Sequence, residues 1–339
     1  MNKNILSLID PDLGTLLIQK GESQLVNDNG ESHPIVNEIP RFVGKENYAN
    51  NFGAQWNEFP KTQLDSYTGI PISELRLERC MEGHLSKLKG KMLLEAGSGA
   101  GRFTEVLLKH GATVHSFDFS NAVEANQFNN GHHDSLTLVQ ADIRRIPFPK
   151  ASYDYVVCLG VIQHTPNPEE SIRCLWEMVK PGGYLVIDHY RWNLGLVLPP
   201  PIGGAESLYR WLILKLPTKS RFKVVKAITN FWFPVHWLFR DSKWIQRILV
   251  RLSPVHFYYP LYNLGSRKVF YEWALLDTHD GTTDFYKHYR NESQIYEYLE
   301  KLGAEDIVVN VAGNGVEAFS RKPSGQVETI EIEPQVFDK

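Results

Sequence analysis

Cysteine is scarce in this sequence. Its 339 residues include three cysteines, Cys80, Cys158 and Cys174, and no two of them form a C-x-x-C pair. Closely spaced cysteine pairs are the usual sign of a zinc site, and many cysteines in a short chain are the usual sign of a disulfide framework. The sequence therefore predicts neither; it names no metal ligand and leaves open whether a metal assists.

Long apolar runs are also missing. No stretch reaches the roughly 20 apolar residues that a membrane-spanning helix needs. The N-terminal MNKNILSLIDPDLG lacks an apolar segment of signal-peptide length. These absences predict a cytoplasmic protein. The formal net charge of −3 favours no particular partner, and a hydrophobic content of 42% is enough for a substantial buried core.

Two segments precede the middle of the chain. Residues 1–42 contain three short apolar runs, TLLIQK, SQLVNDNGES and HPIVNEIPRFV, and the NDNG turn predicts a β-hairpin. Residues 43–90 begin with the aromatic and polar YANNFGAQWNEFPKTQLDSYTG and continue with a helical pattern, ISELRLERCMEGHLSKL. We predict a small β extension over residues 1–42 and a helical, aromatic cap over residues 43–90.

Residues 91–190 alternate between strand and helix patterns. The predicted strands are KMLLEAG, ATVHSFD, LTLVQAD, YDYVVCLG and GYLVIDHY, and helical segments such as FTEVLLKHG and PEESIRCLWEMVKPGG follow the first, second and fourth. This alternation predicts a Rossmann-like α/β core, a mostly parallel sheet with helices on both faces. Residues 291–322 add a helix and two strands around the AGNG turn, which predict a terminal antiparallel hairpin. The acidic tail, residues 323–339, is predicted to be disordered.

The segment at 191–290 breaks this alternation. After VLPPPIGG it has the pattern of several helices rich in Trp, Phe, Tyr, Lys and Arg. From Leu196 to Lys268 there are twelve Lys or Arg residues but only two acids, Glu206 and Asp241. This stretch therefore carries about +10, and the rest of the chain about −13. We predict a basic, aromatic helical insertion.

The sequence LLEAGSGAGRF, residues 93–103, places three glycines directly after an apolar run. A dinucleotide-binding G-x-G-x-x-G motif would need a glycine where Arg102 stands, and no Gly-Lys-Ser/Thr follows as in a P-loop. What remains is E-x-G-x-G-x-G after a strand, with Asp118 and Asp142 at the ends of the next two strands. Because open α/β sheets bind ligands at the carboxyl ends of their strands, these groups are predicted to form one site.

These residue types suit a nucleoside that carries positive charge. Glycines let a ligand approach the backbone closely. A carboxylate at the tip of the second strand can accept hydrogen bonds from both ribose hydroxyls, and one at the tip of the third strand can accept from an exocyclic amine. Glu95, at the end of the first strand, adds negative charge beside such a ligand.

The order and spacing of these motifs resemble the class I S-adenosylmethionine-dependent methyltransferases, over roughly residues 85–190 and 291–322. The segments that carry the resemblance are LLEAGSGAGR, SFDFS, QADIRRIPFPKASYDYVVCLGVIQHTPNP and VKPGGYLVI. The resemblance implies a seven-stranded sheet and S-adenosylmethionine as cofactor. The residues that it assigns to the cofactor are Glu95, Gly97, Ser98, Gly99, Gly101, Asp118, Phe119, Asp142, Ile143, Leu159 and Gly160.

The N-terminal HPIVNEIPRFV is similar to the end of a small zinc-ribbon-like segment that precedes many bacterial methyltransferases. There it follows two cysteine pairs, whereas the first cysteine here is Cys80, so the resemblance implies a metal-free version. Together with NFGAQWNEFPKTQLDSYTG, it associates the chain with bacterial methyltransferases of surface-glycan or secondary-metabolite pathways.

Transfer to a hydroxyl group usually needs a general base, and a histidine beside carboxylates can serve near neutral pH. The segment LLDTHDGTTDFYKHY, residues 275–289, is predicted to be a loop and contains His279 and Asp280. His164, in GVIQHTPNP, follows the fourth strand and is expected to face the cofactor. We predict a catalytic role for His279, Asp280 or His164, with a simple turn as the alternative for residues 277–281.

Aromatic side chains of the 43–90 segment could cover the cofactor, because an aromatic face attracts a sulfonium cation. Core packing of an N-terminal helix is the alternative. The aromatic residues concerned are Phe52, Trp56, Phe59 and Tyr67. Polar residues of the same segment that could position an acceptor are Gln55, Asn57, Gln63 and Asp65.

The basic insertion has three interpretations. It can be a helical cap that forms the acceptor pocket, which we favour. It can lie on anionic lipid through residues 196–268, at the inner face of the membrane. It can also be a dimer interface; the sequence leaves the oligomeric state open. Nucleic acid is disfavoured as a partner, because the chain is acidic overall and contains no recognised RNA-binding module.

The sequence thus predicts transfer of a methyl group from S-adenosylmethionine to an oxygen of a small-molecule, glycan or lipid-linked acceptor. Transfer to carbon or nitrogen of a metabolite needs the same cofactor site and stays open. A non-catalytic partner protein that binds the cofactor is a further alternative.

Overall fold

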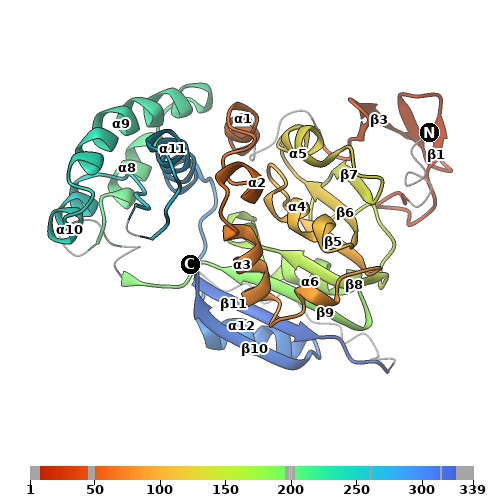
Figure 1. Cartoon of the computed structure of the whole chain (residues 1–339). Helices are drawn as coiled ribbons and strands as arrows, with labels where there is room; N and C mark the ends of the chain where they lie inside the picture. The colour runs from red at the N-terminus through yellow and green to blue at the C-terminus, as the bar shows by residue number, and fades with distance from the viewer. Residues whose placement is uncertain are drawn as a thin grey trace.

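The centre of the molecule is a seven-stranded sheet. The computed structural model of the chain describes residues 8–44, 50–194, 198, 200, 203–259, 261–313 and 315–325. The strand order is β10-β11-β9-β8-β5-β6-β7, in which the last five strands are parallel and β10 and β11 are antiparallel (Figure 1). The strands are β5 (Met92–Ala96), β6 (Thr113–Asp118), β7 (Leu136–Gln140), β8 (Tyr153–Cys158), β9 (Val179–His189), β10 (Glu305–Ala312) and β11 (Gly315–Arg321). The predicted α/β class and the terminal antiparallel hairpin are confirmed.

Helices cover both faces of this sheet. The helices α3 (Ile72–Cys80), α4 (Arg102–Lys109) and α5 (Val123–Asn130) contribute apolar side chains to one hydrophobic cluster. The helices α6 (Pro168–Met178) and α12 (Glu292–Lys301) contribute to the other. The strands between them read as continuous apolar runs because both of their faces are buried.

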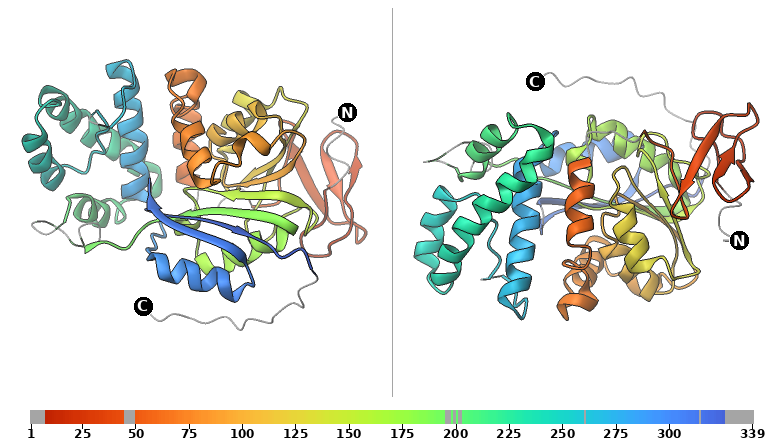
Figure 2. Two further views of the ribbon diagram at one scale, coloured as in Figure 1. Left: turned by 60° about the horizontal axis from the view of Figure 1, so that its bottom comes forward. Right: turned by 90° about the horizontal axis from the view of Figure 1, so that it is seen from above.

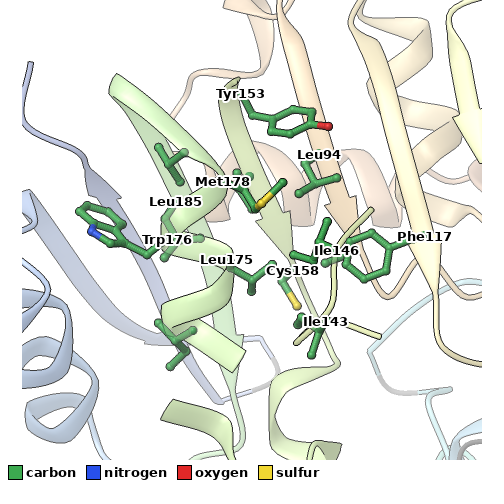
Figure 3. Packing of buried hydrophobic residues seen from close by; sticks show 14 of the residues in the cluster. Leu94, Phe117, Ile143, Ile146, Tyr153, Cys158, Leu175, Trp176, Met178 and Leu185 are labelled. Atoms are coloured by element: carbon green, nitrogen blue, oxygen red, sulfur yellow. The ribbon is translucent and has the colours of Figure 1, made fainter. Parts of the chain in front are cut away.

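The hydrophobic cluster on the α6 and α12 side of the sheet is closely packed. Leu175 and Met178 of the α6 segment gather with Leu94, Phe117 and Tyr153, which come from three strands (Figure 3). All five are buried. Burying one such apolar side chain stabilises the fold by roughly 1.5–3 kcal/mol relative to leaving it exposed. This packing fixes the strand ends from which the site is built.

The N-terminal residues form a separate antiparallel sheet. Its strands are β1 (Ile18–Lys20), β2 (Gln24–Val26), β3 (Ser32–Val36) and β4 (Ile39–Pro40), and the NDNG turn connects β2 to β3 as predicted. Arg41 joins this sheet to the core, because its guanidinium donates a hydrogen bond of 3.0 Å to Gln140 Oε1 at the end of β7.

The remaining helices lie above the carboxyl ends of the parallel strands. They are α1 (Asn50–Glu58), α2 (Asp65–Thr68), α8 (Glu206–Ile213), α9 (Thr218–Leu238), α10 (Lys243–Leu252) and α11 (Arg267–Thr283), with the short 3-10 helix η3 (Ile162–His164). A second 3-10 helix, η2 (Leu85–Lys87), precedes β5 at the amino end of that strand. The insertion α8–α11 lies on the opposite side of the core from the N-terminal sheet (Figures 1 and 2). Among the described residues, no helix has the length and apolar content to cross a bilayer.

Two local predictions are wrong. Residues 275–283 do not form a loop, because α11 continues to Thr283. Residues 284–289, which follow the helix, belong to no helix or strand, as the loop prediction expects. This helix packs against α1, α8 and α9, and tertiary packing overrides the turn preference of its Asp, Thr and Gly residues. The helix that was expected to reach Gly183 ends at Met178, and β9 already begins at Val179. Of the predicted disordered tail, residues 326–339 lie outside the described part of the chain.

Candidate active site

A cavity of about 720 Å³ lies between the strand ends of the core and the helical insertion. Its floor includes Gly97, Ser98, Gly99, Asp118 and Asp142 of the core. Its other walls come from α1, α3, α8, α11 and the segment between α10 and α11. Residues of these elements and of the loops beside them that line the cavity include Gln55, Trp56, Gln63, Arg76, Glu206, His256, Leu261, Tyr262, Trp273, Asp277, Asp280 and Lys287.

The glycine loop leaves no room for side chains. Gly97 has φ of 75°, a conformation that residues with a Cβ rarely adopt. An alanine Cβ at this position would lie 2.2 Å from Cγ2 of Val161. Gly101 does not line the cavity; it is the N-cap residue of α4, and a Cβ there would lie 2.2 Å from Oδ1 of Asn126. The loop therefore presents backbone to the cavity at Gly97–Gly99 and packs the helix at Gly101.

Asp118 is held at the tip of β6 by three donors. Its carboxylate accepts hydrogen bonds from the Gly99 N–H at 2.9 Å, the Ser120 N–H at 2.8 Å and the Ser120 hydroxyl at 2.7 Å. Burial raises the pKa of Asp118, while these hydrogen bonds act in the opposite direction. Because the carboxylate lines the cavity beside Phe119, it can accept a pair of hydroxyl groups.

Asp142 and Ile143 line the cavity after β7, and Leu159 and Gly160 line it after β8. The Asp142 carboxylate is bridged by Arg144, whose Nη2 lies 2.7 Å from Oδ2. These four residues and the loop lie where the resemblance expects a cofactor.

Glu95 is the exception among the acidic positions. It is buried under the loop and does not line the cavity. Its Oε2 accepts hydrogen bonds from the hydroxyl groups of Thr104 at 2.5 Å and Ser116 at 2.8 Å. Burial raises the pKa of Glu95 to about 7. Glu95 therefore ties β5 to α4 and β6 and can act on a ligand only through the loop above it.

Of the three aromatic candidates of the N-terminal cap whose side chains the structure describes, Trp56 lines the cavity and the other two do not. The indole of Trp56 lies over the glycine loop, 3.4 Å from the position that a Cβ on Gly99 would take. Phe59 packs instead against apolar residues of the insertion, and Tyr67 is exposed. Phe52 has a side chain outside the described part of the structure.

Two of the four polar candidates, Gln55 and Gln63, line the cavity. Asn57 instead donates to the Asn121 carbonyl at 3.0 Å, near the surface. The carboxylate of Asp65 accepts hydrogen bonds from the N–H groups of Ser73 and Glu74 at the start of α3. Asp65 therefore has a structural role in the cap.

His164 and Asp280 both line the cavity on the insertion side of the core. The His164 Nδ1 lies 3.3 Å from the Asp284 carboxylate and 3.3 Å from the Tyr286 carbonyl oxygen. Asp284 in turn accepts a hydrogen bond of 2.7 Å from Arg210 Nε. A His ring held at Nδ1 by a buried carboxylate has the tautomer in which Nε2 is the proton acceptor.

The protonation of this group is shifted by its surroundings. Burial alone would lower the pKa of His164, but the hydrogen bond to Asp284 and the charge of Asp280 raise it overall. Burial raises the pKa of Asp280 to about 6, and the charge of Asp284 acts in the same direction. His164 and Asp280 can therefore exchange protons with a bound molecule near neutral pH.

His279 does not line the cavity. Its ring is buried in α11, packs edge-on against Phe222 and is hydrogen-bonded through Nδ1 to Oε1 of Gln55. Burial, aided by the charge of Arg221, lowers the pKa of His279 to about 3. The ring is therefore neutral, and its visible role is to orient Gln55.

Replacing His279 with Gln is expected to remove part of the acid sensitivity of folding. The pKa of about 3 in the folded chain lies below the ordinary 6.5. As pH falls below 6.5 the unfolded chain therefore binds this proton first, and stability is lost until the pH approaches 3. Between about pH 7.5 and about pH 5.5, urea unfolding of the wild type should lose about 1.4 kcal/mol more than that of the variant.

Other buried histidines, such as His115 and His189, are present in both proteins, so their contributions cancel in this comparison. Equal losses in the two proteins would mean that the His279 ring takes up a proton in the folded state. That result would restore it as a candidate base.

The sequence did not single out several polar residues of the cavity. Arg102 donates hydrogen bonds to Gln63 Oε1 at 2.7 Å and Ser73 Oγ at 3.1 Å. Burial, followed by the charge of Arg76, lowers the pKa of Arg102 to about 10, so it remains a cation. Arg76 is paired with Asp188. Two guanidinium groups thus lie close to the glycine loop.

A second polar group lies in the insertion. Glu206 contacts His256 at 3.1 Å and also Lys287. Asp277 accepts hydrogen bonds of 3.1 Å from Gln63 and from the Trp273 indole. The only sequence signal for Glu206 was the scarcity of acids from Leu196 to Lys268, where it is one of two.

Comparison with known proteins agrees with this geometry. Residues 94–187 match the family model of a methyltransferase domain. The ubiquinone biosynthesis O-methyltransferase of Azoarcus sp. (strain BH72) is 32% identical over 145 residues, which are 42% of this chain and 60% of that protein. The enzyme of the same name from Pseudomonas entomophila is 33% identical over 129 residues, 37% of this chain and 55% of that protein. The chain thus spans little more than half the length of these curated relatives.

Among solved structures, one similar protein is from Methanococcus maripaludis and is assigned to the S-adenosylmethionine-dependent methyltransferases. It is 15% identical, with a TM-score of 0.45, over 84% of this chain and 99% of that one.

Proposed function

We propose that the chain transfers the methyl group of S-adenosylmethionine to an oxygen atom of a small-molecule acceptor, in keeping with the match of residues 94–187 to the family model of a methyltransferase domain. One observation carries the proposal. A single cavity joins the glycine loop and Asp118 on the core side to the His164–Asp284 pair on the insertion side. Cofactor recognition and proton acceptance can therefore act on neighbouring molecules.

The residues of the cavity fit S-adenosylmethionine. Asp118 can accept the ribose hydroxyls, and Asp142 can accept the adenine amine. The guanidinium groups of Arg76 and Arg102 complement the carboxylate of the methionine part, and the indole of Trp56 offers an aromatic face to the sulfonium charge. When bound, the cofactor supplies an electrophilic methyl group.

The chain contributes alignment, exclusion of water and proton transfer. Holding the acceptor oxygen in line with the methyl carbon accounts for much of the acceleration. His164 Nε2 takes the hydroxyl proton as the oxygen–carbon bond forms and the carbon–sulfur bond breaks, and the bonding electrons stay on sulfur. Asp284 stabilises the imidazolium that results.

The names of the curated relatives support oxygen as the acceptor atom and a small molecule as the acceptor. We favour a lipid-linked acceptor over a glycan, because the insertion side of the cavity is rich in aromatic and apolar side chains. These are Tyr190, Tyr258, Leu261, Tyr262 and Trp273. On this proposal the insertion is the acceptor cap, and the protein works at the surface of a membrane.

The proposal is tested by binding and turnover of the full chain. Calorimetry should show binding of S-adenosylmethionine and S-adenosylhomocysteine. Incubation with methyl-labelled cofactor and a set of phenols, with and without isoprenoid tails, should give labelled methyl ethers, with the tailed phenols preferred. Label on carbon or nitrogen would reject the O-methyl assignment. Binding without turnover on any acceptor would favour a non-catalytic partner protein, and absence of binding would reject the whole proposal.

A further inference from the structure

The helix α10, Lys243–Leu252, carries two parallel stripes on its surface. Lys243, Arg247 and Arg251 recur every four residues, and so do Trp244, Ile248 and Leu252. Residues spaced by four lie on the same side of a helix, so a cationic stripe runs beside an apolar one. The apolar side chains are open to solvent, with exposed fractions of 70% for Trp244, 39% for Ile248 and 53% for Leu252.

The opposite side of α10 is firmly anchored. Gln246 and Leu249 are buried. The His236 ring of α9 bonds the Gln246 side chain at 2.7 Å and the Ser253 hydroxyl at 3.0 Å. Gln246 Nε2 also donates to the carbonyl oxygens of His236 and Phe239. The exposed stripes are therefore held in a fixed orientation and are not the core-facing side of a loosely packed helix.

Neighbouring residues extend the apolar surface. Leu238 ends α9, and Phe239 accepts a hydrogen bond from the side chain of Gln246. Their exposed fractions are 71% and 38%. Monomeric proteins rarely expose large aromatic and aliphatic side chains together unless the patch contacts a partner.

The positive charge of α10 indicates that its binding partner is negatively charged. In the insertion, ion pairs are formed by cations outside α10, such as Lys226, Arg240 and Lys268. Within the described part of the chain, Lys243, Arg247 and Arg251 form none. An apolar stripe flanked by unpaired cations complements the surface of an anionic lipid bilayer. The acyl chains of the bilayer can accept the apolar side chains, and its negatively charged headgroups can pair with the cations.

We propose that α10 lies in the interfacial layer of an anionic lipid bilayer, with Trp244, Ile248 and Leu252 inserted and Lys243, Arg247 and Arg251 at the lipid phosphates. This inference deepens the proposed function, since it names the surface from which a lipid-borne acceptor is taken. Leu261 and Tyr262, in the segment between α10 and α11, both line the cavity and are exposed. They mark an apolar entrance to the cavity on the same insertion.

Co-sedimentation of the full chain with vesicles tests this proposal. We expect binding to phosphatidylcholine vesicles that contain about one third phosphatidylglycerol, little binding to pure phosphatidylcholine, and weakening at high salt. The variant K243E/R247E/R251E should lose at least about 100-fold in partition, because each lost cation near an anionic surface contributes roughly fivefold and the new carboxylates add repulsion. The variant W244A/I248A/L252A should lose binding to a similar degree.

The matched control is K87E/K89E/K301E, which makes the same charge change on exposed core positions and should bind as the wild type does. Equal binding of all four proteins, or no binding of the wild type, would overturn the proposal. So would a lipid-free dimer that the α10 variants dissociate in light scattering. Calorimetry with S-adenosylmethionine separates the two proposals, since the α10 variants should keep wild-type affinity whether or not vesicles bind.

Discussion

Replacing Gly97 with Ala is expected to lower the affinity for S-adenosylmethionine by at least about 100-fold, or about 2.7 kcal/mol. Two costs combine at this position. The backbone has φ of 75°, and the new Cβ would lie 2.2 Å from Cγ2 of Val161. Positive φ costs roughly 1–2 kcal/mol for a residue with a Cβ. The overlap with Val161 can be relieved only by moving the loop that forms the floor of the cavity. Isothermal titration calorimetry measures the loss directly.

Gly160 provides the matched control for this substitution. It lines the same cavity at φ of 78°, but a Cβ there meets no atom within 4 Å. Gly160→Ala should therefore show the effect of the backbone strain alone, a loss of affinity of about 30-fold or less. Trimming the neighbour in the double variant G97A/V161A should recover part of the affinity. Equal losses for Gly97→Ala and Gly160→Ala would show that the contact with Val161 does not set the loop position.

The core and the floor of the cavity could be predicted from sequence because their signals are local. Apolar runs separated by helical segments specify parallel strands, and the ends of those strands carry Asp118 and Asp142 within one or two residues of the pattern. Gly97 and Gly99 could be predicted for the same reason. A backbone conformation that only glycine adopts readily requires glycine at that position, so it is visible in the sequence. Glu95 belongs to the same motif, but only the structure shows that its carboxylate is turned into the core.

The insertion side could not be predicted, because its site depends on contacts between distant residues. Asp284 meets His164 across 120 positions of sequence, and Gln55 meets His279 across 224. The periodicity of helices and strands is a local pattern and does not indicate which distant residues come into contact. The turn-forming composition around Asp280 also misled the prediction, since α11 is held as a helix by its neighbours rather than by its own propensity. The candidate base thus moved from His279, the most suggestive residue in the sequence, to His164.

Replacing His164 with Asn is expected to lower the maximal rate of methyl transfer by roughly 10²–10⁴-fold, the usual contribution of a general base. The affinity for S-adenosylmethionine should stay within about threefold of the wild-type value, because Asn preserves the polar contact of Nδ1 and lies outside the glycine loop. The wild-type rate should rise with pH, since only the neutral ring accepts a proton and the pKa of His164 is raised above its ordinary value. Single-turnover rates measured across the neutral range give both quantities.

Asp280→Asn tests the same assignment through its electrostatics. The Asp280 carboxylate raises the pKa of His164, so its removal should lower that pKa and move the rising limb of the rate profile to lower pH. If Asp280 were the base, the variant would instead lose the rate at every pH, and a limb near its own pKa of about 6 would vanish. A shifted limb in Asp280→Asn together with a flat, slow profile in His164→Asn assigns the proton to the imidazole. The reverse pattern assigns it to the carboxylate.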